Sequence, residues 1–299
     1  MIKFLKNTFI LVIAITIISC EDVIKVDLEG SKPQLVVDAF INDSLAKQTI
    51  KLRLSKSYLD NGTAPAATGA EVTIEDAVPI LGGVRRKFVF TDDNNDGNYE
   101  WTPTASDIFP LGIPGLFYSL KIKYKGEEFQ SFAKMDSVPK IDSLGYEFVE
   151  QEIRGPDTLK AGYNLTMVAK DLPGQTNGYW FKTFKNGKFF NKPGDMNLAY
   201  DAAFAPGSDG VAFVAPIIFN LSPERYQIGD SVVVECHSVG IATWFFLNQA
   251  QSQMNNGGLF ATPVVNVPSN IENVNKNSDV KATGWFCAAS ISRKALRVK

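Results

Sequence analysis

The chain has 299 residues and a formal net charge of −2, with 45% apolar and 11% aromatic residues. This composition excludes a disordered stalk, because disordered chains have a low apolar content and few aromatic residues. It also argues against nucleic-acid binding, which needs a basic patch that this sequence lacks. The length predicts about two domains, each large enough for its own hydrophobic core.

The N-terminal stretch is the most informative part of the sequence. Lys3 and Lys6 precede an almost wholly apolar run at 8–18, and a small residue then stands directly before Cys20. This order is that of a secretion signal, and its ending resembles a bacterial lipobox, in which the cysteine is lipidated and becomes the mature N-terminus. A helix over this run rises only about 16 Å, too short for a hydrocarbon core of about 30 Å. We therefore predict a signal peptide at 1–19 and lipidation of Cys20; the alternative is an ordinary cleaved signal that stops at a cysteine.

Residues 20–32 are polar and charged and are interpreted as a tether to the lipid. Glu21 and Asp22 follow the cysteine directly. In Bacteroidota, an acidic pair at this place resembles the signal that sends lipoproteins across the outer membrane to the cell surface. A solvated linker without any address is the alternative. In both cases, we expect a folded body anchored by lipid to a bacterial envelope.

Short strand patterns follow one another from 33 to 136, separated by turns rich in Gly, Pro and Asn. The clearest lies at 49–55, where Ile50, Leu52 and Leu54 share one face of an alternating segment. Many short strands at spacings of about 8–12 residues are typical of a β-sandwich. We predict an N-terminal sandwich at 33–136, either immunoglobulin-like or transthyretin-like.

The second half of the chain is predicted to be a separate domain. Residues 137–143 are polar and contain Pro139, which indicates a linker. Residues 144–299 again carry strand patterns, together with one helix at about 239–255 that ends at an Asn-Asn-Gly-Gly stop signal. Residues 186–210, rich in Gly, Asn, Asp and Pro, are interpreted as a long irregular excursion. The predicted fold is therefore mainly β, with two β-sandwich-like domains and one α-helix in the second.

Several short motifs occur along the chain in a recognisable order. Cys20 is followed by an acidic and aliphatic alternation, and Gly69-Ala-Glu-Val-Thr-Ile reads as a GA-x-V-x-I strand. Asp171-Leu-Pro-Gly precedes an aromatic strand, and Gly284-Trp-Phe-Cys-Ala-Ala-Ser stands near the end. In this order the motifs resemble the Bacteroidota outer-membrane lipoprotein family of domain of unknown function 4249. That family has no established catalytic residues, and its members are often found beside TonB-dependent receptors. The resemblance therefore implies an accessory role at the outer membrane, in nutrient uptake.

One segment matches the first half of a calcium-binding loop. Asp92, Asn94 and Asp96, followed by Gly97, alternate oxygen ligands in the D-x-[DN]-x-[DN]-G pattern. The second half does not match, because position twelve is Pro103 instead of a bidentate Glu. A hairpin turn built from Asn, Asp and Gly is the favoured alternative. We therefore predict neither a metal site here nor any other cofactor.

The remaining cysteines, Cys236 and Cys287, both lie in strand-like runs. In an oxidising compartment they are either disulfide-bonded or two separate small buried side chains, because sequence alone does not fix the Cα distance. His237 is the only histidine. It adjoins Cys236 on a strand, so the two side chains point to opposite faces and form no catalytic dyad. We interpret His237 as a strand histidine at a surface or a domain seam.

Aromatic residues gather at 179–181 and again within 186–210. The first group is either a stacking platform for sugars or part of a core. The second group is predicted to contact a protein partner, because aromatic residues on a loop are common interface anchors. Its alternative is that these side chains fold back and complete the core. The members of the second group are Phe189, Phe190, Tyr200 and Phe204.

The sequence contains no G-x-S-x-G nucleophile elbow. We therefore expect a non-enzymatic accessory protein, lipid-anchored in the outer membrane and facing the cell surface. Its expected partner is a TonB-dependent receptor or another envelope protein, its membrane contact is the lipid, and no nucleic acid is involved. An adhesion or envelope-assembly module is the second hypothesis, and a surface hydrolase is the third.

Overall fold

The computed structural model shows a mainly β fold with one α-helix in the part of the chain that it describes, which confirms the predicted fold class. The predicted signal peptide at 1–19 and Cys20 lie outside the described residues. Residues 33–299 form one compact unit. The described residues are 32–57, 60, 62–78, 83–154, 157–174, 176–200, 207, 209–214, 217–256 and 265–299, with the backbone alone at 152–154 and 157–159.

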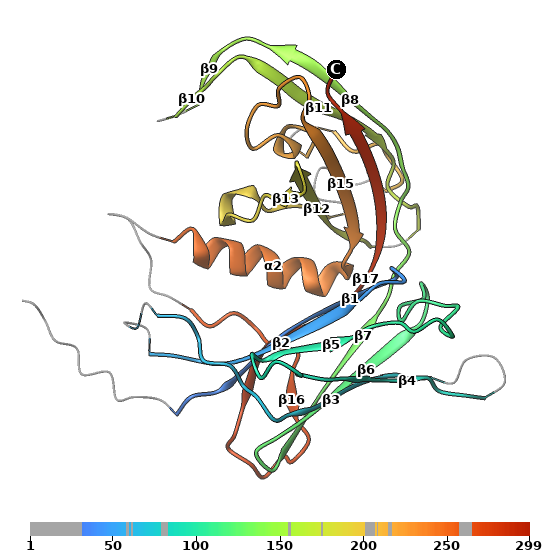
Figure 1. Cartoon of the computed structure of the whole chain (residues 1–299), viewed down its shortest axis with the longest axis vertical. Coiled ribbons are helices and arrows are strands. Elements are labelled where there is room, and N and C mark those ends of the chain that lie inside the picture. The colour runs from blue at the N-terminus through green and yellow to red at the C-terminus, as the bar shows by residue number, and fades with distance from the viewer. Residues whose placement is uncertain are drawn as a thin grey trace, which may run out of the picture. The chain divides into compact units, whose positions relative to one another are not determined.

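The N-terminal half consists of short strands, joined by a tight turn between β6 and β7 and by longer connections elsewhere (Figure 1). Along the first strand, Val37, Ala39 and Ile41 are buried while Asp38 is exposed, the alternation of a strand with one face in a core. The strands are β1 (Leu35–Asn42), β2 (Gln48–Leu54), β3 (Glu71–Asp76), β4 (Lys87–Phe90), β5 (Asn98–Trp101), β6 (Phe117–Tyr124) and β7 (Glu127–Lys134).

Helical, 3-10 and strand elements make up the C-terminal half. The strands up to the helix are β8 (Ile141–Val149), β9 (Glu152–Arg154), β10 (Asp157–Leu159), β11 (Gly162–Ala169), β12 (Gly178–Lys185), β13 (Lys188–Phe189), β14 (Asn197–Tyr200) and β15 (Ser231–Ser238). The other elements are η1 (Pro193–Asp195), η2 (Phe219–Leu221), α2 (Gly240–Met254), β16 (Glu272–Asn273) and β17 (Ala282–Arg297).

The long strand β17 joins the two halves in one sheet. Its first part runs parallel to β1, from the pair Leu35↔Ala282 to the pair Asn42↔Ala289. Its second part runs antiparallel to β15. The result is a sheet in the order β13-β12-β15-β17-β1-β2-β5, with β14 beside β12. The two predicted domains at 33–136 and 144–299 therefore share a sheet.

A first core lies between this sheet and a five-stranded sheet of order β16-β7-β6-β3-β4. Its largest fully buried side chains include Tyr99, Tyr118 and Phe129. The core is that of a sandwich, as predicted for 33–136, but two of its strands come from the C-terminal region. β16 pairs with β7 and β17 pairs with β1. The sandwich is thus completed by residues far along the chain.

The second core lies on the same face of the shared sheet, under β12 and β15. The antiparallel pair β8 and β11 contributes Ile141, Leu165 and Met167, which pack with Phe181 and Val234. Alternation along β17 explains how one strand serves both faces. Phe286 and Ala288 lie in the first core and Leu296 packs on the second, while Trp285, Cys287 and Ala289 face the helix.

The helix α2 lies against the opposite, concave face of the sheet (Figure 1). It matches the helix predicted at 239–255 to within one residue at each end. The indole Nε1 of Trp285 donates to Thr243 Oγ1 over 2.9 Å, and Leu247 is buried beside it. Within the described part of the chain, no helix has the length and apolar content to cross a membrane.

The irregular excursion predicted at 186–210 is wrong over 188–200, where the chain forms β13, η1 and β14. Asn186 and Gly187 have φ values of 50° and 79°, so they make the tight left-handed turn that leads from β12 into β13. β14 then pairs with Gly178–Phe181 on the same edge of β12 as β13, because β15 occupies the other edge. These elements are too short for their alternation to stand out from the turn residues around them.

A cleft on the concave face of the sheet

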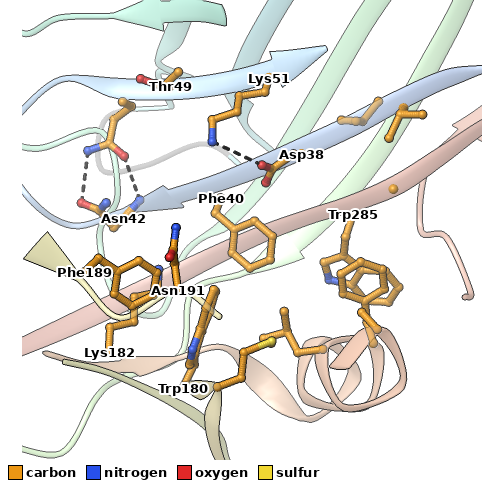
Figure 2. Close-up of a pocket in the computed structure, with 18 of the residues that line it drawn as sticks. Asp38, Phe40, Asn42, Thr49, Lys51, Trp180, Lys182, Phe189, Asn191 and Trp285 are labelled. Carbon is orange, nitrogen blue, oxygen red and sulfur yellow. Dashed lines mark hydrogen bonds and ion pairs between the residues drawn. The ribbon is translucent and has the colours of Figure 1, made fainter. Parts of the chain in front are cut away.

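A cleft of about 660 Å³ opens beside α2 on the concave face of the sheet (Figure 2). β1 and β2 form one wall, β12 and β13 form the other, and β17 and α2 complete it. Clefts of this volume with a largely apolar lining are typical of sites for small molecules. We therefore treat this cleft as the candidate functional site.

The alternation of side chains along the strands determines which residues line the cleft. On β12, Tyr179 and Phe181 point into the second core, while Trp180 and Lys182 line the cleft. β1 has the same arrangement, since Phe40 lines the cleft between residues that are buried in the first core. The walls therefore carry the residues that are not needed for the core.

Five of the described residues that line the cleft are aromatic. Phe40 and Trp180 meet edge to face with their centroids 6.1 Å apart, and Phe189 lies 6.4 Å from Trp180. Trp285 stacks on Phe246 of α2, with the two ring centroids 4.6 Å apart. Figure 2 shows the rings of Phe40, Trp180, Phe189 and Trp285 gathered around one space. Such rings bury a large apolar area of a ligand and lose little side-chain entropy.

Three lysines and one aspartate are the charged residues of the lining within the described chain. Lys51 Nζ lies 3.7 Å from Asp38 Oδ2, and Lys47 pairs with Glu100 at 2.8 Å; both are exposed pairs of small energetic weight. Lys182 differs, because its Nζ lies 3.9 Å from the centroid of the Trp180 ring and 6.0 Å from that of Phe189. Burial lowers the pKa of Lys182, against the attraction of Glu235.

A pair made of a buried histidine and a half-buried glutamate lies beside Lys182, on the neighbouring strand β15. His237 Nε2 lies 3.0 Å from Glu235 Oε2, and Arg293 Nε lies 3.7 Å from Glu235 Oε1. In the pairing of β12 with β15, Trp180 is opposite His237 and Lys182 is opposite Glu235. Burial lowers the pKa of His237 to about 4, although the hydrogen bond with Glu235 acts in the other direction. His237 is therefore a buried, neutral histidine on β15 at ordinary pH, so the surface alternative is wrong.

The comparison with family models agrees with the order of motifs in the sequence. The family described as domain of unknown function (DUF4249) matches residues 21–295. The chain belongs to this family. The DUF4249 match spans every residue of the cleft, so the cleft is made entirely from the family's own domain. A comparison with curated proteins returned no match.

The aromatic residues predicted as one contact surface have different surroundings in this DUF4249 chain. Phe189 lines the cleft, whereas Phe190 packs against the second core, with its ring centroid 6.5 Å from that of Tyr226. Tyr200 packs on Trp244 of α2, with the two ring centroids 4.3 Å apart. Phe204 lies outside the described residues. For Phe190, the alternative of folding back onto the core is therefore the correct one.

Cys236 and Cys287 are free and buried, so no disulfide joins them. Cys236 is opposite Ser292 on β17, and Cys287 lies about 16 Å farther along that strand at the usual rise per residue. A disulfide needs Cα atoms within about 7 Å. Cys236 lies in the second core, whereas Cys287 faces the helix on the other side of the sheet, and burial raises the pKa of Cys287 to about 12.

The carboxylates of the predicted half calcium loop are used inside the turn. Asp92 accepts hydrogen bonds from the backbone N–H groups of Asp96 and Gly97, at 3.0 Å each. Asp96 accepts two from Asn98, one from its backbone N–H at 2.9 Å and one from its side-chain amide at 2.8 Å, and Asn94 is exposed. The turn is therefore the Asx-rich one that the sequence favoured. It differs from a simple hairpin in that β4 and β5 belong to different sheets.

Sequence reasoning missed Phe40, Lys182 and Trp285 as site residues. The signal was present, because Asp38, Phe40 and Asn42 alternate with core residues on β1. What the sequence could not show is that β17 brings this face of β1 beside the same face of β12. For the aromatic group at 179–181, both interpretations hold in part: Tyr179 and Phe181 are core, and Trp180 belongs to the cleft.

Proposed function

We propose that this protein is a non-enzymatic, lipid-anchored binding protein of the outer membrane that faces the cell surface. In this role it captures a small molecule in the cleft and partners a TonB-dependent receptor in nutrient uptake. The cleft is the observation that carries the proposal. Its aromatic walls and its few polar groups are the composition of a site that holds and orients a ligand.

The anchor is supported by the sequence before Cys20. The charged start, the short apolar run and the cysteine after a small residue are the order of a lipoprotein signal. A lipid tether would confine the protein to one surface together with its receptor. Tethering raises the effective concentration of one partner near the other, so a modest affinity between them is sufficient. The acidic pair directly after Cys20 supports the proposal that the protein faces the cell surface.

Labelling and capture in the native bacterium test the anchor and the partner together. Cells that express the wild-type chain or Cys20→Ala are grown with labelled palmitate, and each protein is captured from solubilised outer membranes. We expect labelled wild-type protein with a TonB-dependent receptor bound to it, and unlabelled Cys20→Ala with the receptor reduced or absent.

Two results would overturn different parts of the proposal. Incorporation of label into Cys20→Ala would show that the lipobox interpretation is wrong. Efficient capture of lipidated protein with structural envelope proteins in place of a receptor would favour the adhesion or envelope-assembly role. Cys236→Ala is the matched control, because it removes a buried thiol elsewhere and leaves the signal intact.

A further inference from the structure

We infer that the cleft binds an organic carboxylate whose apolar body lies among the aromatic rings and whose charged end meets Lys182. This inference rests on the proposed binding role of the cleft and adds the chemical class of its ligand.

Charge is the first argument. The described lining has three lysines and one aspartate. That aspartate pairs with Lys51, Lys47 pairs with Glu100 beside the cleft, and Lys182 carries the positive charge that remains. The whole chain, in contrast, has a formal charge of −2. A cation-rich cleft in an acidic protein favours an anionic ligand over a cationic one.

Lys182 is the second argument. Among the described residues no carboxylate forms an ion pair with its ammonium, whose neighbours are the rings of Trp180 and Phe189. Burial lowers the pKa of Lys182, so its charge is held at a cost that a bound anion would offset. The side-chain amide of Asn191 lines the same cleft and likewise has no protein hydrogen-bond partner in the described part of the chain, so it can donate to a carboxylate. Figure 2 shows Asn191 beside Phe189 and Lys182.

The surroundings of the aromatic rings disfavour a neutral sugar as the ligand. A pyranose stacks on a free indole face, but one face of Trp180 is covered by the Lys182 ammonium at 3.9 Å. Trp285 stacks on Phe246 with only 16° between the ring planes. Sugar recognition also depends on free acceptor groups, but Asp38 pairs with Lys51. The side-chain oxygens of Asn42 and Gln48 already accept hydrogen bonds from each other's residue. Edges of rings with methionine and leucine side chains around them suit an aliphatic or aromatic body instead.

Paired probes test the inference in solution, with the folded chain from residue 21 on. Octanoate is compared with octanol, and 2-naphthoate with 2-naphthol, at neutral pH by isothermal titration. Each pair keeps the apolar body and removes the charge. We expect the carboxylates to bind at least about tenfold more tightly than their neutral partners, the range of a hydrogen bond to a charged group. The better of the two carboxylates identifies an aliphatic or an aromatic body.

Lys182→Met should weaken carboxylate binding by about tenfold or more and leave the weak binding of octanol unchanged. Lys188→Met is the matched control, because Lys188 is an exposed lysine on β13 that does not line the cleft. Equal binding of acids and alcohols, or full carboxylate binding in Lys182→Met, would overturn the ligand class and leave a binding cleft. Absence of binding by all four probes would also overturn the ligand class. The proposed partnership with a receptor is tested independently by the capture experiment.

Discussion

Gly284 is the position where the structure predicts the largest effect of a single methyl group. It lies on β17 opposite Val37 of β1 and has a φ of 107°. A Cβ at this position would lie 1.9 Å from the Val37 carbonyl oxygen and 2.7 Å from its backbone N and C. Ordinary contacts between heavy atoms are about 3.5–4.0 Å. The obstacle is backbone, so no side-chain rotation can relieve it.

Two costs add in Gly284→Ala. A non-glycine residue in a sparsely populated backbone region costs about 1–3 kcal/mol. Overpacking of a well-packed site costs about 1–3 kcal/mol more. We therefore expect the free energy of unfolding to fall by about 2–6 kcal/mol, a large share of the 5–15 kcal/mol that is typical of a domain. The measurement is urea unfolding followed by tryptophan fluorescence.

Gly126→Ala separates the two costs. Gly126, in the turn between β6 and β7, has a φ of 83° but nothing within 4 Å of an added Cβ. Its substitution should therefore cost only the backbone preference, about 1–2 kcal/mol. If Gly284→Ala were no less stable than Gly126→Ala, the close approach of β1 and β17, and with it the floor of the cleft, would be wrong.

Two further predictions concern the cleft wall. Because burial lowers the pKa of His237 to about 4 from 6.5, the unfolded chain takes up a proton before the folded one as pH falls, so stability declines between about pH 6.5 and 4. In the wild type, the free energy of unfolding in urea should fall between pH 7.5 and pH 5, and in His237→Gln this fall should be smaller by about 2 kcal/mol. An equal fall in both proteins would contradict the buried neutral state. Phe189→Ala should leave the free energy of unfolding within about 1 kcal/mol of the wild type, while Phe190→Ala lowers it by about 2 kcal/mol or more because Phe190 packs on the second core. The reverse order of the two stabilities in urea would place Phe189 in the core.

Local patterns predicted the elements well where they reflect burial alone. Ile50 and Leu52 were placed on one face by alternation, and both are fully buried. The helix end was predicted from the Asn-Asn-Gly-Gly signal, and the helix stops at Met254. These features depend on neighbours within a few residues, which is the range over which sequence patterns carry information.

The shared sheet and the cleft depend on contacts between distant parts of the chain. Nothing local in Gly284-Trp-Phe-Cys indicates that this strand runs parallel to β1 and then continues beside β15. The cleft exists only because of that pairing, which brings Phe40 and Trp180 to a centroid distance of 6.1 Å. The half-buried position of Lys182 could not be predicted for the same reason, since an alternating strand shows two faces but not what covers each of them.

The indole signals of the four tryptophans test the cleft as a ligand site most directly. Trp180 and Trp285 line the cleft, whereas Trp101 packs on the first core and Trp244 contacts Tyr200 outside it. A titration of the ¹⁵N-labelled chain with octanoate, followed through the four indole N–H signals, reads all of them at once. We predict saturable shifts at Trp180 and Trp285 with Trp101 and Trp244 unmoved. Shifts confined to Trp101 or Trp244, or no shift at any indole, would contradict a ligand site in the cleft.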